Sequence, residues 1–123
     1  MIMEEARFRV RETWQRFFND HDVFIMPVDF VAAFPHDHEG LMAERTLETL
    51  EGPRRYIDQL FWMSFSSLTG LPCTVAPVGF TGEGLPVGVQ IIGPYLEDAT
   101  PIHVADLMAG VVGGYVKPEG FAP

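Results

Sequence analysis

Two apolar runs joined by a glycine-rich turn constrain the fold of this chain more than any other feature. The runs cover residues 73–80 and 86–92, and Gly82 and Gly84 lie between them, where they supply turn conformations. Gly93-Pro94 then stops the second run. Strand-length runs separated by such a turn predict a β-hairpin or an adjacent strand pair, so we expect the rest of the chain to pack around this pair.

Hydrophobic spacing and chain punctuation predict three helices and one further strand. Apolar residues at spacings of three and four indicate helices, and a short apolar run ended by Pro27 indicates a buried strand. Pro53 and Pro101 each stand where the first position of a helix is expected, the latter after Thr100 as N-cap. The expected elements are a helix over 2–19, a strand over 23–26, a connection over 27–52 with at most a helical turn around 41–50, a helix over 53–70 and a helix over 100–112.

The helices are expected to bury broad apolar faces. The last helix leaves only a narrow polar strip, His103, Asp106 and Gly110, and is therefore expected to be nearly all buried. Phe8 falls on the charged side of the first helix and should be exposed in an isolated domain. The residues expected to face inward are Met3, Ala6, Val10, Trp14, Phe17 and Phe18 in the first helix, and Ile57, Leu60, Phe61, Ser64, Phe65 and Leu68 in the second, widened by Trp62 and Met63.

This order of elements predicts an α/β fold, a small sheet with helices packed on it. We expect a mixed sheet, because the Gly-rich turn favours an antiparallel pair while the helix between the first two strands permits a parallel crossover. The length allows one domain at most, over residues 1–123, with an irregular tail over 115–123.

Charge and composition exclude several classes of partner. The formal net charge is −9, with 17 acids against 8 basic residues, so neither nucleic acid nor an anionic membrane is expected to bind. The arginines of the first helix, Arg7, Arg9, Arg11 and Arg16, alternate with glutamates and are interpreted as a solvated, salt-bridged face. A single cysteine, no recognisable signal peptide and no apolar run long enough to span a bilayer favour a cytoplasmic protein.

The chain is also unusually apolar for a small domain. Hydrophobic residues make up 47% of it and the mean hydropathy is +0.12. A small domain that exposes large apolar patches usually buries them against another chain. The composition therefore predicts a homo-oligomer or association with a further polypeptide segment.

One cluster has the chemistry of a metal site. His36 and His38 alternate in the long connection, and Glu39 or the distant His21 would complete a ligand shell. No spaced second pair of ligands accompanies them, and polar clusters in loops are ordinary. A solvated loop is the preferred interpretation, and no metal is predicted.

The nucleophilic side chains lack activating partners in the sequence. Ser64, Ser66 and Ser67 lie in an aromatic-rich helical stretch with no base at a suitable spacing, so we interpret them as packing residues that bond back to their own helix. Cys73 lies between Pro72 and an apolar run and is expected to be a small buried hydrophobe. Gln90, the polar residue inside the second strand, is expected to tie neighbouring backbone together rather than to face a pocket.

Several of these segments together resemble the C-terminal portion of amidase-signature enzymes. The resemblance rests on Thr69-Gly70-Leu71-Pro72 with its apolar run ending in Pro-x-Gly, and above all on residues 84–94, GLPVGVQIIGP. It extends upstream to residues 22–27 and downstream to residues 113–115, and so covers most of the chain.

The resemblance implies an amide hydrolase with a Ser, cis-Ser, Lys triad and no metal or cofactor. In that family the triad lies earlier in a much longer polypeptide, and the lysine present here, Lys117, is close to the C-terminus. No catalytic residue is therefore assigned in this chain, which is expected to be inactive alone and to associate with the missing N-terminal amidase portion. Its expected contribution is part of the sheet and a stretch of pocket wall formed by Thr69, Gly70, Leu71 and Pro72.

Two other hypotheses remain open from the sequence. The first is a non-enzymatic binding or assembly module that self-associates through its apolar surface. The second is a small metal-dependent hydrolase built on His36 and His38.

Overall fold

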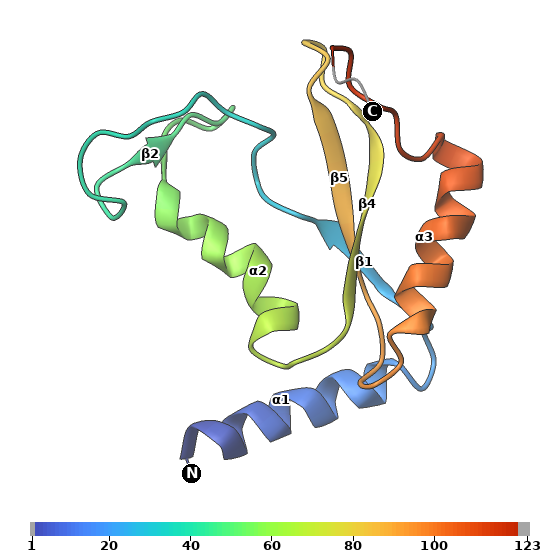
Figure 1. The fold of residues 1–123 in the computed structure, drawn as a ribbon. Coiled ribbons are helices and arrows are strands. Elements are labelled where there is room, and N and C mark those ends of the chain that lie inside the picture. Colours follow the sequence, from blue (N-terminus) through green and yellow to red (C-terminus); the bar gives the residue numbers. More distant parts are fainter. Residues whose placement is uncertain (1, 121–123) are drawn as a thin grey trace.

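The computed structural model describes residues 2–120 and shows a small sheet with helices on both sides (Figure 1). α2 and α3 lie on opposite sides of the sheet, and α1 runs beneath it. The elements, in chain order, are α1 (Ile2–Phe17), β1 (Phe24–Pro27), β2 (Thr46–Leu47), β3 (Arg54–Arg55), a 3-10 helix (Tyr56–Gln59), α2 (Leu60–Ser67), β4 (Cys73–Phe80), β5 (Pro86–Ile92) and α3 (Ala99–Val112).

The predicted strand pair is confirmed as the centre of the main sheet. β4 and β5 pair antiparallel, with Cys73 opposite Ile92, and the order of strands is β1-β5-β4. The α/β class is likewise confirmed, but the expected parallel pairing is not found between the described strands. β1 pairs antiparallel with β5, which lies between β1 and β4. The crossover through α2 therefore brings the chain back one strand away from β1, and β5 fills the gap.

The core lies between the sheet and the helices α1 and α2. Its buried residues are Met26, Leu71 and Ile92, and five partly buried aromatic residues pack against them: Trp14, Phe18, Phe24, Trp62 and Phe65. Successive strand residues point to opposite faces, so Ile92 faces this cluster while Ile91, also fully buried, faces α3. The side chain of Gln90 lies on the same face as Ile92 and is only 4% exposed.

Gln90 has the structural role predicted for it. Its Nε2 donates to the carbonyl oxygen of Pro27 at 2.8 Å and to that of Trp62 at 2.9 Å. The buried amide thus satisfies its donors while it joins β5 to the end of β1 and to α2.

The predicted helix faces are only partly correct. Trp14 in α1 and Phe18 directly after it reach the core, but Met3 and Val10 are exposed; Phe8 is exposed, as predicted. In α2 the core contacts come from Trp62 and Phe65. The residues expected to point inward but found exposed are Leu60, Phe61, Met63 and, directly after the helix, Leu68. The apolar stripes are thus wider than the surface available to cover them.

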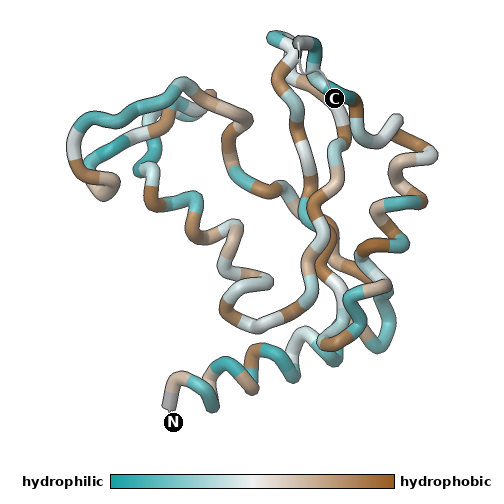
Figure 2. Tube along the Cα trace, in the orientation of Figure 1, coloured by the Kyte–Doolittle hydropathy of each residue, from teal (hydrophilic) through white to brown (hydrophobic). Residues whose placement is uncertain are grey.

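The prediction that α3 is nearly all buried is wrong. Pro101 is its one buried residue, and the helix exposes Ile102, Leu107, Val111 and Val112. Hydrophobic segments run along the whole length of α3 (Figure 2). The helix also begins earlier than expected, at Ala99 after Asp98, so that Thr100 is not its N-cap. Within residues 2–120, no helix is both long and apolar enough to cross a membrane.

A small hairpin replaces the expected helix start at Pro53. Thr46 pairs with Arg55 and Leu47 with Arg54, and the turn between them is closed by Thr49 Oγ1, which donates to the carbonyl of Gly52 at 2.7 Å. Pro53 therefore leads into β3, and the helical turn expected around 41–50 is replaced by an isolated turn and β2. The long connection thus carries secondary structure of its own.

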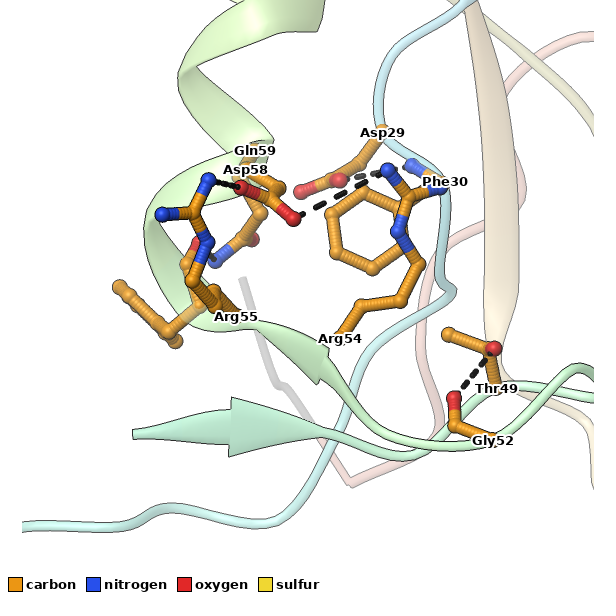
Figure 3. A network of polar contacts seen from close by, with 9 residues as sticks. Asp29, Phe30, Thr49, Gly52, Arg54, Arg55, Asp58 and Gln59 are labelled. Atoms are coloured by element: carbon orange, nitrogen blue, oxygen red, sulfur yellow. Dashed lines mark hydrogen bonds and ion pairs between the residues drawn. The ribbon is translucent and has the colours of Figure 1, made fainter. Parts of the chain in front are cut away.

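A cation–π contact joins this hairpin to the segment after β1, and an ion pair joins it to the 3-10 helix (Figure 3). The guanidinium of Arg54 lies 4.9 Å from the centre of the Phe30 ring, and Asp58 accepts from Arg55 at 2.9 Å. Asp29 accepts a hydrogen bond from the backbone N–H of Phe30 at 2.7 Å. Burial raises the pKa of the Asp29 carboxyl, and this hydrogen bond offsets the rise in part.

Candidate functional site

The segment Thr69–Pro72, which joins α2 to β4, is tightly fixed by its own backbone. Thr69 Oγ1 donates to the carbonyl of Phe65 at 2.5 Å, and the N–H of Gly70 donates to that of Ser66 at 2.7 Å. Gly70 adopts φ +68°, a left-handed conformation that glycine accommodates without strain. These bonds satisfy carbonyls at the end of α2 and turn the chain sharply into the sheet.

α1 holds the same segment from outside. Arg11 Nε donates to the carbonyl of Thr69 at 2.8 Å, and the guanidinium carbon lies 3.8 Å from the centre of the Tyr95 ring. A Cβ on Gly70 would lie 2.8 Å from a guanidinium nitrogen of Arg7. α1 therefore contacts both the segment that precedes β4 and the segment that follows β5.

The prediction of a uniformly solvated arginine face on α1 is therefore wrong for Arg11. Arg9, which pairs with Glu5 at 2.9 Å, does fit that prediction, and both side chains are well exposed. No local pattern signals the role of Arg11, because its partners Thr69 and Tyr95 are 58 and 84 positions away.

The residues expected to form pocket wall lie along two hollows. Gly70, Leu71 and Pro72 line one of about 470 Å³, together with Ser66, Ser67, Cys73, Leu96 and Asp98. Thr69 is almost fully buried and lines a second hollow, a groove of about 610 Å³ between α1 and α2. The α1–α2 groove is mostly apolar: besides Thr69 it is lined by Met3, Glu4, Ala6, Arg7, Val10, Trp14, Ser64, Phe65, Ser67 and Leu68.

Neither the serines nor the cysteine near this segment is activated. Ser64 Oγ donates to its own helix, to the carbonyl of Phe61 at 2.7 Å, as predicted. No hydrogen bond links any serine of α2 to a histidine or lysine within the part of the chain that the structure describes. A nucleophilic serine needs such a base, so α2 cannot supply the nucleophile of an acyl transfer by itself.

Cys73 is exposed, which contradicts the prediction of a buried residue. The reason is its place on β4, the edge strand of the sheet, on the face that α2 leaves partly uncovered. Partial desolvation raises the pKa of its thiol, and hydrogen bonds from Ser66 and from the backbone of Ile91 lower it in part. The thiol therefore stays protonated at neutral pH and is a poor nucleophile.

The histidines of the long connection lie elsewhere in the fold. His36 and His38 are exposed, with ring centres 5.6 Å apart, and line a hollow of about 800 Å³ beside the β2–β3 hairpin. His21 stacks on Phe17 at 4.2 Å instead of joining them. Within residues 2–120, no three His, Cys, Asp or Glu side chains are grouped so that they could hold a metal ion.

The sequence of this chain is similar to those of known proteins over most of its length. The family model described as Amidase matches residues 1–101, which include the whole sheet and the Thr69–Pro72 segment. A glutamyl-tRNA(Gln) amidotransferase subunit from Thermosynechococcus vestitus is 34% identical over 102 residues, which are 83% of this chain and 19% of the relative. An acylamidase from Rhodococcus erythropolis is 34% identical over 94 residues, 76% of this chain and again 19% of the relative. The chain thus spans about a fifth of the length of these curated relatives.

Proposed function

The chain belongs to the amidase family, and we propose that it is the C-terminal part of an amide hydrolase whose Ser, cis-Ser, Lys triad is supplied by sequence outside these 123 residues. The observation that carries the proposal is the family match over residues 1–101, in a chain whose serines bond to no histidine or lysine among residues 2–120 and whose lysine, Lys117, follows the matched region. Carbon–nitrogen bond cleavage is proposed from the names of the two relatives, one an acylamidase and the other part of an amidotransferase.

In this proposal the chain acts as one domain that supplies sheet and pocket wall. The catalytic serine of the complete enzyme attacks the amide carbonyl, the amine leaves, and the acyl group passes to water or to another acceptor. Residues Thr69–Pro72 border the substrate, because they are rigidly held at a junction of helix and sheet and line open hollows. No cofactor takes part, and we propose the cytoplasm as the compartment.

The exposed apolar surface supports a continuation of the fold on the α2 side, either by the same polypeptide or by a separate one. The edge strand β4 exposes Val75, which pairs with Gln90 and so shares the α2 face, and the α1–α2 groove is open and apolar. Unpaired strand edges and apolar grooves of this kind are normally covered in a finished protein. We propose that the preceding amidase portion covers them.

The test is reconstitution of amide hydrolysis. The Rhodococcus erythropolis acylamidase, truncated before the region aligned with this chain, is mixed with the chain, and release of a chromogenic aniline from an acyl anilide is followed. We expect no release by either part alone and release by the mixture; the truncated acylamidase with its catalytic serine replaced by alanine is the control.

Two results would contradict the proposal. The first is hydrolysis by the 123-residue chain alone, which would place the catalytic groups within it. The second is a combination of two findings. The reading frame before Met1 contains no Gly/Ser-rich segment with a preceding lysine, and the chain forms a stable complex with the truncated acylamidase that shows no hydrolysis. That combination would favour a binding or assembly module instead.

A further inference from the structure

α3 exposes a continuous stripe that has no partner among the described residues. Two rows of residues spaced by four form it: Ile102, Asp106 and Gly110, and beside them His103, Leu107 and Val111. Ile102 and Leu107 are each 58% exposed, and Val111 is 85% exposed. Rows with this spacing are the ridges that pack between those of another helix.

The stripe lies away from the surfaces involved in the proposed function. α3 packs its other side on β4 and β5, across the sheet from α2 (Figure 1). The continuation proposed above concerns the α1–α2 groove and the α2 face of the sheet, whereas the stripe lies on the α3 side. The inference about the stripe is therefore tested separately from the proposed function.

The two polar side chains of the stripe make it self-complementary. It carries one carboxylate, Asp106, and one imidazole, His103, in an otherwise apolar surface. The chain as a whole has a formal charge of −9, so two copies repel each other least where they meet through a surface of low net charge. α1, by contrast, presents Glu4, Glu5 and Glu12.

We propose that a second copy of this chain docks on the stripe, with the two α3 helices antiparallel about a two-fold axis. An axis midway between residues 104 and 105 sets Ile102 opposite Leu107 of the second copy and, in the same register, His103 opposite Asp106. Each contact occurs twice, as two-fold symmetry requires. The imidazole N–H donates to the carboxylate at the rim while the apolar pairs exclude water at the centre.

The first test is the concentration dependence of the mass of the chain, measured by sedimentation equilibrium. We expect a reversible dimer of twice 13.8 kDa. Leu107→Asp should raise the dimer dissociation constant by at least about tenfold, the effect of losing a central apolar contact. Leu68→Asp is the matched control, because Leu68 is comparably exposed but lies at the end of α2. Far-UV circular dichroism verifies folding, and Ile102→Asp is the second variant if Leu107→Asp does not fold.

The second test is a charge swap that reports the register. His103→Asp and Asp106→His should each weaken the dimer, since each places like side chains opposite one another, and the double variant should restore it. A monomer at all concentrations, or a dimer weakened by Leu68→Asp but not by Leu107→Asp, would overturn the proposal. Failure of the double variant to restore the dimer would overturn the register. Amide hydrolysis is measured separately, so the proposed function can fail while this inference holds, and the reverse.

Discussion

Gln90 and Pro27 are joined by a hydrogen bond between the Gln90 side chain and the Pro27 carbonyl, 2.8 Å long and spanning 63 positions of sequence. The same nitrogen also donates to the carbonyl of Trp62. One side chain thus connects β1, β5 and α2 at the place where the sheet meets the aromatic core. The amide is suited to this position because it offers two donors and carries no charge.

Replacement of Gln90 by glutamate should destabilise the fold strongly. A buried carboxylate would face two carbonyl oxygens and donate to neither, so we expect a loss of about 3 kcal/mol or more in the free energy of unfolding at neutral pH. Urea denaturation measures it. Gln15→Glu, the same change at an exposed site, should change the free energy by less than about 0.5 kcal/mol; equal effects would show that the two carbonyl bonds contribute little.

Replacement of Arg11 by glutamine should loosen the Thr69–Pro72 segment. The variant loses the charged bond to the Thr69 carbonyl and the stacking on Tyr95, and we expect a loss of about 1–3 kcal/mol. Hydrogen exchange should speed up at the amide of Gly70 before it does so in β5. Arg9→Gln, which removes only an exposed ion pair, is the control. Unchanged exchange at Gly70 would mean that the segment is held by α2 alone.

Replacement of Gly93 by alanine should displace α3 from the sheet. A Cβ at this position would lie 2.6 Å from Pro101 Cδ, in the first turn of α3, and the backbone there is not left-handed, so the effect is purely steric. We expect a loss of about 1–3 kcal/mol. Gly82→Ala, where a Cβ meets nothing within 4 Å, is the control. Similar melting temperatures for the two variants would contradict close packing of Pro101.

Asp29 should make the stability depend on pH. Burial raises its pKa in the folded state, so the folded protein disfavours the carboxylate. The contribution of Asp29 is therefore fully present below the unfolded pKa, about 3.9, and is lost as the pH rises through the folded pKa. Asparagine keeps an acceptor for the Phe30 N–H without the charge. The stability advantage of Asp29→Asn over the wild type should grow with rising pH, as followed by urea unfolding at several pH values. The exposed Asp22→Asn is the control, and an advantage that shrinks with rising pH would refute the sign.

The elements marked by local signals were predictable from the sequence, and those that depend on distant partners were not. β4 and β5 are framed by glycine and proline, and a single amide in an apolar strand needs hydrogen-bond partners, which Gln90 finds. β2 and β3 are two residues long, too short for any periodicity, and Pro53 suits a strand start as well as a helix start.

The buried faces of the helices could not be predicted from the sequence. The apolar residues of α2 and α3 exceed what this sheet covers, so periodicity identified the helices but not the side that is buried. At the candidate site, the Thr69–Pro72 segment was found by resemblance, whereas Arg11 and Tyr95 were missed because a helix and a loop 84 positions apart meet only in the folded chain.

The pairing of β1 with β5 also has a consequence for how the chain acquires its fold. β4 and β5 are joined by a short turn and can form a hairpin early, whereas Phe24 must find Ile92 across 68 positions. During synthesis β1 leaves the ribosome long before its neighbour in the sheet exists, and its edge stays open through the interval. The assembled hairpin is thus the template, and the closing step in the folding of this three-stranded sheet is the pairing of β1 with β5.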